Sequence, residues 1–220
     1  MAVSICLSFT QCKSKEDKAN ILIKDYMFKN LYDFESYQPI ETKIDSAFHT
    51  IYNDSLAMYY AFSILLSDNE KEKLKTEYES LMSSVDIWCD GSYYSRYSYN
   101  KCQDCLDQAK ENLNKQFFWM SRVETYRDSL VGLADTLTKR FVGWEVTHDF
   151  RCKTKGGNPD IGHYVFVMDK DFKTILSKKD MGDDDEKEIK SIIDESLSMT
   201  EEERADLKER IQDLISKVNK

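Results

Sequence analysis

Apolar residues recur at helical spacing through most of the first 140 residues. An amphipathic segment from residue 19 predicts a short helix that ends before Pro39, because the residue before a proline disfavours the helical conformation. A second apolar face then predicts another helix, since its members stand alternately four and three residues apart. That face comprises Ile44, Phe48, Ile51, Ser55, Met58, Phe62 and Leu65.

A polar segment at residues 67–70 is expected to end this helix and to begin the next one. Ser67 can accept a hydrogen bond from the backbone of the new helix and Glu70 can reach back, which is the capping-box pattern. Together the two helices predict an antiparallel hairpin. The apolar face of the second helix comprises Leu74, Tyr78, Leu81, Val85 and Trp88.

A long third helix is predicted over residues 102–140, and its apolar stripe continues for most of that length. Three helices with such stripes can form the core of a bundle. Core packing is therefore the simplest role for the methionine and aromatic residues on them. The stripe comprises Leu106, Ala109, Leu113, Phe117, Met120, Val123, Tyr126, Leu130, Leu133 and Leu137.

The hydrophobic period changes after residue 140. Alternate residues of "FVGWEVTHDF" share one face of a strand, "HYVFVM" is apolar on both faces, and "KTILS" gives a third strand. A loop rich in Gly, Asn and Pro separates the first two. The pattern predicts a β-meander over residues 141–177, which needs a helix to cover it.

Two C-terminal helices are predicted at residues 186–198 and 200–219, the second opened by a capping box from Thr200 to Glu203. The fold class is therefore α+β and mostly α: an antiparallel helical bundle, a small antiparallel β-meander and C-terminal helices. We expect residues 13–220 to form one compact domain, with a helical part at 13–140.

Composition limits the kinds of partner. The chain of 220 residues has 31 basic and 40 acidic residues, for a net charge of −9. An acidic surface repels phosphate backbones, so we expect no nucleic-acid partner. No apolar run approaches the ~18 residues that a membrane-spanning helix needs.

The first residues, "MAVSICLSFTQCKSKEDK", have no charge before Lys13. An apolar stretch, a cysteine and then a polar segment is the order found in a secretory signal peptide that leads to a lipoprotein. The segment resembles a bacterial lipoprotein signal, and this resemblance implies that Cys12 carries the lipid and that residues 1–12 are a signal segment. The alternative is a short buried strand or helix.

Cysteines frame the segment "DGSYYSRYSYNKCQDC" at residues 90–105. In an oxidising compartment we expect Cys89 to form a disulfide with Cys102 or Cys105. Because a Cys-x-x-Cys pair at a helix start has a lowered thiol pKa, thiol–disulfide exchange through Cys102 and Cys105 is an alternative. A four-cysteine zinc site would need a second paired spacing, which Cys89 and Cys152 do not provide.

The same segment is rich in tyrosine. Tyrosine rings interleaved with small polar residues are typical of binding loops, whereas the simpler reading is a connection whose rings pack over helix ends. We favour the packed connection, and the alternative is a binding surface for a protein or glycan ligand. Its candidate residues are Tyr93, Tyr94, Arg96, Tyr97 and Tyr99.

No catalytic motif is recognisable, and we predict no catalytic residues, cofactor or metal. The three histidines are far apart in the sequence. His148 falls on the apolar face of a strand, where a hydrogen-bonded core histidine is the favoured interpretation.

Over its whole length the chain resembles uncharacterised exported lipoproteins of Bacteroides and related Bacteroidetes. The segments that carry this likeness are "SFTQCKSKEDK", "YDFESYQPIETKIDSAF" and "GWEVTHDFRCKTKGGNPDIGHYVFVMDKDF". The resemblance implies a location in the cell envelope, lipid-anchored to a bacterial membrane and facing the periplasm or the surface, and no mechanism. We expect a binding or accessory module. The alternatives are the exchange enzyme and a purely structural envelope component whose C-terminal helix docks a partner.

Overall fold

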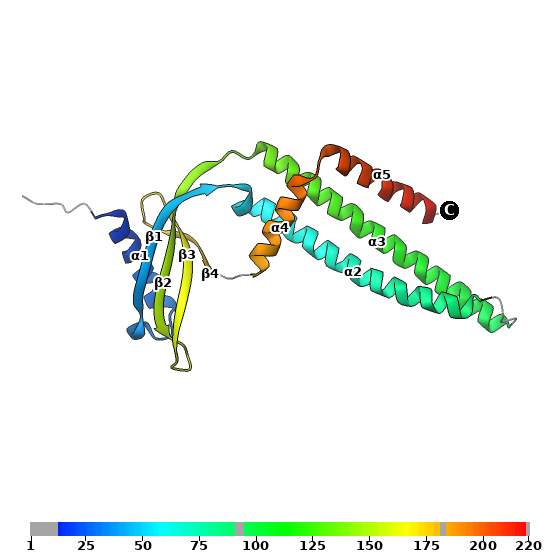
Figure 1. The fold of residues 1–220 in the computed structure, drawn as a ribbon, viewed down its shortest axis with the longest axis horizontal. Helices are drawn as coiled ribbons and strands as arrows, with labels where there is room; N and C mark the ends of the chain where they lie inside the picture. The colour runs from blue at the N-terminus through cyan, green and yellow to red at the C-terminus, as the bar shows by residue number, and fades with distance from the viewer. Residues whose placement is uncertain (1–12, 91–94, 181–183, 219–220) are drawn as a thin grey trace, which may run out of the picture. The chain divides into compact units, whose positions relative to one another are not determined.

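The computed structural model describes residues 13–90, 95–180 and 184–218, and these residues have an α+β fold that is mostly helical, as predicted (Figure 1). The chain divides into two compact units. The sheet unit contains the described residues up to His49 and those from Lys139 to Asp180, and the helical unit contains the other described residues. The prediction of a single domain over residues 13–220 stays a prediction, and the two units are described separately.

The sheet unit consists of a helix and a four-stranded antiparallel sheet. The strands follow their chain order, β1-β2-β3-β4, so each pairs with its sequence neighbour among the strands. Its elements are α1 (Lys15–Asn30), a 3-10 turn η1 (Phe34–Ser36), β1 (Gln38–His49), β2 (Arg140–Lys153), β3 (Pro159–Asp169) and β4 (Ile175–Asp180).

Helix α1 covers one face of this sheet (Figure 1). Ser14 and Asp17 form a reciprocal capping box that fixes its first turn. Three fully buried residues four positions apart project from one face of α1 onto the sheet. The joint core comprises Ala19, Ile23, Met27, Val146, Phe150, Phe166, Met168 and Phe172.

The interpretation of Ile44 and Phe48 as part of a helix is wrong, because both lie in strand β1. Residues four apart share a face in a strand as well as in a helix, so the spacing alone could not distinguish the two. Pairing with a strand about 100 residues away decides the outcome: Ile44 stands opposite Val146 of β2. The three-stranded meander predicted from the sequence therefore becomes a four-stranded sheet.

The helical unit is built around a long antiparallel hairpin (Figure 1). Helix α4 crosses this hairpin and α5 runs alongside α3. The elements are a 3-10 turn η2 (Ile51–Asn53), α2 (Ser55–Trp88), α3 (Arg96–Thr136), α4 (Asp184–Ser198) and α5 (Glu201–Val218).

The predicted helix break at residues 67–70 is also wrong, since α2 is continuous through it. The hydroxyl of Ser67 is buried and donates to the carbonyl of Ser63 at 2.7 Å, as a mid-helix serine can. Glu70 forms an ion pair with Lys73 one turn on. No glycine or proline stands between Ser67 and Trp88, so nothing in that range ends the helix. The second predicted capping box is confirmed, because Glu203 accepts from the backbone of Thr200 and Thr200 from that of Glu203.

Small residues let the helices approach closely at the core of the helical unit. Ala57 and Ala61 of α2 are fully buried against Leu130 of α3 and against Ile189 and Ile193 of α4. None of the helices in the described ranges combines the length and the apolar character that a membrane span requires.

Candidate functional site

A disulfide closes the end of the α2–α3 hairpin. Helix α2 ends at Trp88, and Cys89, the next residue, bonds to Cys102 in the second turn of α3, with Cα atoms 5.1 Å apart. This is one of the two pairings left open for Cys89 by the sequence. By constraining the unfolded chain, a crosslink with a sequence separation of 13 contributes about 3 kcal/mol.

Two further described cysteines, Cys105 and Cys152, are half-buried free thiols. Burial raises the pKa of the Cys152 thiol, so this group is a poor nucleophile near neutral pH. Cys105 lies one turn beyond Cys102 on α3. A redox cycle through Cys102 and Cys105 would therefore first have to exchange the Cys89–Cys102 bond, by attack of Cys105 on Cys102.

The first turn of α3 carries the candidate binding residues that the structure describes. Ser95 caps the helix by accepting from the backbone of Ser98 at 3.0 Å. The side chains of Tyr97 and Tyr99 are 63% and 64% exposed, and Arg96 is exposed as well. Tyr93, Tyr94 and Cys12 lie outside the described residues.

Tyr97 is partly fixed by its neighbour across the hairpin. Its ring meets that of Trp88 edge-on, with centroids 5.9 Å apart. Edge-to-face ring pairs of this kind stabilise by about 1 kcal/mol beyond the area they bury. The ring is thus oriented while most of its surface stays open, which is the state expected of a contact residue.

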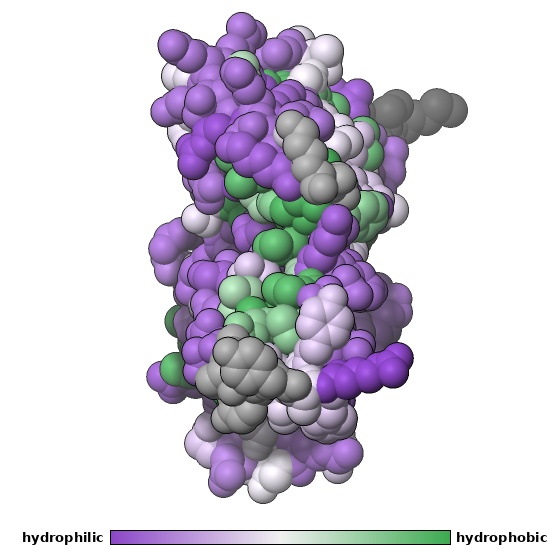
Figure 2. Space-filling view, turned by 90° about the vertical axis from the view of Figure 1, so that its right-hand side faces the viewer, coloured by the Kyte–Doolittle hydropathy of each residue, from purple (hydrophilic) through white to green (hydrophobic). Residues whose placement is uncertain are grey.

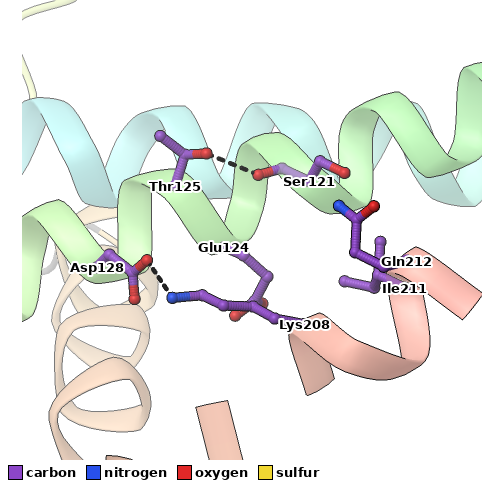
Figure 3. A pocket seen from close by; sticks show the side chains of 7 residues that line it. All are labelled: Ser121, Glu124, Thr125, Asp128, Lys208, Ile211 and Gln212. Carbon is purple, nitrogen blue, oxygen red and sulfur yellow. Dashed lines mark hydrogen bonds and ion pairs between the residues drawn. The ribbon is translucent and has the colours of Figure 1, made fainter. Parts of the chain in front are cut away.

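A small pocket lies between α3 and α5, with a volume of about 200 Å³ (Figure 3). At one side Lys208 of α5 donates to the carboxylate of Asp128 on α3, and this ion pair ties the two helices together. The lining residues are Ser121, Glu124, Thr125, Asp128, Lys208, Ile211 and Gln212.

Glu124 is the unusual member of this lining, because its side chain is only 6% exposed. Its Oε1 accepts from Arg127 at 2.9 Å, and Arg127 also donates to Glu195 of α4 at 2.9 Å. Glu124 Oε2 and Arg127 Nε are buried without a hydrogen-bond partner. The cluster holds α4 against α3. Sequence reasoning missed it, although a charged residue directly after Val123 of the apolar stripe was a visible indication.

Helix α5 leaves part of its apolar seam exposed near this pocket. Leu214 is 42% exposed, whereas Ile211 is buried. Figure 2 faces the end of the helical unit at which α2 gives way to α3, and it shows hydrophobic side chains gathered between α5 and the hairpin, with hydrophilic surface on either side.

In the sheet unit, His148 is a fully buried core histidine, as expected. Thr42 donates its hydroxyl hydrogen to Asn20, so it must accept from Nδ1–H of His148, and Nε2 then accepts from Tyr37 at 2.8 Å. Burial lowers the pKa of His148 and raises the pKa of Tyr37 to about 12. Both groups are neutral at pH 7, and the network is a structural one.

Comparison of the chain with protein-family models, with curated proteins and with solved structures gives no match. Within residues 13–90, 95–180 and 184–218, no group of three or more His, Cys, Asp or Glu side chains is arranged to hold a metal ion. The functional argument therefore depends on the geometry of these side chains alone.

Proposed function

We propose that the protein is a binding or accessory module of the bacterial cell envelope and that the closed end of the α2–α3 hairpin is its contact surface. The observation that supports binding is the exposure of Tyr97 and Tyr99 on a helix start that the Cys89–Cys102 disulfide holds in place.

The chemistry of this surface suits a protein or glycan ligand. Tyrosine buries a large flat ring on binding and has few rotatable bonds, so little conformational entropy is lost. The disulfide and the Ser95 cap fix the backbone before the ligand arrives, which lowers the cost of ordering it. Arg96 adds a fixed positive charge and several hydrogen-bond donors.

Site-specific photo-crosslinking in cells tests the contact surface for protein ligands. A benzophenone amino acid at position 99 should give a crosslinked product, and the same group at position 32 should not. Tyr32 is a matched control because it is 73% exposed but lies in the sheet unit. Equal crosslinking from both positions would contradict the assignment.

A glycan array tests the other ligand class. The purified protein should bind a defined set of glycans, and the Tyr97→Ala, Tyr99→Ala double variant should lose that binding while Tyr32→Ala keeps it. A double variant with unchanged glycan binding, together with equal crosslinking from positions 99 and 32 in the first experiment, would remove the proposed surface.

The envelope location rests on Cys12 as the site of lipid attachment. Labelling cells with a fatty-acid analogue should mark the wild-type protein, and Cys12→Ser should lose both the label and the membrane fraction. A Cys12→Ser protein that remains labelled and membrane-bound would contradict lipid attachment at Cys12. That result would not bear on the contact surface at the end of the hairpin.

A further inference from the structure

One outward face of the hairpin is apolar where the rest of the protein is highly charged. Large side chains on α2 point away from the buried Ala57 and Ala61, at positions three or four residues apart that place them on one face. They are between 46% and 55% exposed. These residues are Leu56, Tyr59, Phe62 and Leu66.

Helix α3 continues the same face. The ring of Tyr59 meets that of Tyr126 edge-on with centroids 6.3 Å apart. Arg122 donates to the Tyr126 hydroxyl and lies 5.7 Å from the ring centroid of Phe118, which is itself 54% exposed. We call this continuous surface the aromatic face. It comprises Leu56, Tyr59, Phe62, Leu66, Phe118, Arg122 and Tyr126.

The aromatic face lacks negative charge in a protein whose net charge is −9. The segment "SLAMYYAFSILLS", residues 55–67, contains no charged residue, and "QFFWMSR", residues 116–122, contains only Arg122. Protein interfaces are depleted of acidic residues at their centres and enriched in aromatic residues and arginine. The composition of this face is that of an interface centre and differs from that of a solvated helix surface.

We propose that the aromatic face is the interface of a homodimer, in which a second copy of this chain packs its own aromatic face against it. Two copies of an acidic protein repel one another over most of their surfaces, and contact through this face avoids that repulsion. A side-chain repeat of three and four residues on paired helices is also the pattern by which two hairpins pack into a four-helix bundle. Such a two-fold arrangement uses the same patch on both copies.

The size of the face agrees with a dimer. Five large side chains, each about half exposed, present roughly 500 Å² of apolar surface, taking ~200 Å² for a full side chain. A standard interface buries about 800 Å² per partner, of which about 65% is apolar in homodimers. The aromatic face therefore supplies about the apolar area that one partner needs.

Sedimentation velocity of the purified full chain, from about 1 to about 100 µM, tests the dimer. We expect wild type to sediment as a dimer that contains no intermolecular disulfide on a non-reducing gel. Phe62→Glu should weaken the dimer about 100-fold or more, since it buries a charge at the centre of the interface. Ile87→Glu should leave it intact, because Ile87 is also exposed on the same helix but lies about 38 Å further along.

Circular dichroism checks that the variants fold. If Phe62→Glu does not fold, Leu66→Lys serves as the second variant that should disrupt the dimer. A photo-crosslinker at position 66 should join two copies of the chain, and one at position 87 should not. A wild type that sediments as a monomer throughout this range, or a dimer that survives a folded Phe62→Glu or Leu66→Lys, would overturn the proposal. A wild-type monomer crosslinked at position 66 to a different protein would overturn it in favour of a heterologous partner.

Discussion

The two units bury different kinds of side chain. In the sheet unit, α1 and the strands enclose large residues, including Phe150, Phe166 and Met168, together with the neutral His148. In the helical unit, Ala57 and Ala61 of α2 face the core beside Ile64, and several large residues of that helix, among them Tyr59 and Phe62, point outward.

This difference means that the residues that stabilise the fold and the residues that are available for binding lie in different parts of the molecule. A sheet needs large side chains to fill the space beneath a covering helix, whereas closely packed helices are joined by small ones. Outward aromatic residues on α2 and α3 add little to the stability of a single chain, but they are available for contacts with other molecules. We therefore expect substitutions in the sheet unit to change the free energy of unfolding and those on the hairpin surface to change binding.

The largest effect is expected in the sheet core. Phe166→Ala should lower the free energy of unfolding by about 3–5 kcal/mol, because it removes a fully buried ring and leaves a cavity. Urea denaturation followed by tryptophan fluorescence in a Trp88→Phe, Trp119→Phe background, which leaves only Trp144 of the sheet unit, measures the change. Phe28→Ala is the control, since that ring is 66% exposed, and equal losses in the two variants would break the comparison.

The next effect concerns the hairpin end. Cys89→Ser should cost about 3 kcal/mol of stability, by opening the Cys89–Cys102 crosslink. Wild type treated with reductant should lose a similar amount, while Cys89→Ser should be insensitive to reductant. Cys152→Ser should retain the sensitivity of wild type. A wild type that unfolds identically with and without reductant would show that the crosslink does not form in solution.

A smaller effect should appear on acidification of the sheet unit. Burial, opposed more weakly by the charge of Asp149, lowers the pKa of His148 in the folded state, so the unfolded chain binds this proton at a higher pH. The stability that neutral His148 contributes is present above about pH 6.5 and is lost as the pH falls below it, at no more than about 1.4 kcal/mol per pH unit. The free energy of unfolding of wild type and of His148→Gln, measured between pH 7 and pH 5, should fall less steeply with decreasing pH for the variant. Equal dependence on pH in the two proteins would contradict a lowered pKa of His148 in the folded state.

Removing one hydrogen bond from the same network should have a similar or lesser effect. Tyr37→Phe leaves Nε2 of His148 without its donor, which should cost about 1–2 kcal/mol. Tyr32→Phe removes a hydroxyl from an exposed ring and should change the free energy of unfolding by less than about 0.5 kcal/mol. Equal changes in the two variants would mean that the buried network does not stabilise the sheet unit.

Local pattern predicted most of the elements, and it failed where distant contacts decide. The strands after residue 140 and the helix that begins at the Thr200–Glu203 box were predictable, because neighbouring residues suffice for both. Strand β1 was missed because Ile44 and Phe48 fit either period, and only pairing with β2 distinguishes them. The Ser67 box failed because the same residues can bond within a continuous helix.

The candidate site was predictable to a similar extent. The composition was enough to select the segment around Tyr97 and Tyr99 as a candidate binding site. The positions of the cysteines were enough to restrict the disulfide partner of Cys89 to two residues. The cluster of the buried Glu124, Arg127 and the exposed Glu195 joins α3 to α4 across 68 residues, a separation at which sequence spacing carries no information.

The most direct measurement is a thermal melt of the Tyr97→Ala, Tyr99→Ala double variant beside wild type. Both side chains are almost two-thirds exposed, so their loss should cost only about 1–2 kcal/mol, most of it from the Tyr97–Trp88 ring pair, and should lower Tm by about 2–6 °C. Two packed aromatic residues would instead cost several kcal/mol together. A decrease in Tm of about 10 °C or more would therefore contradict the assignment of this end of the hairpin as a contact surface.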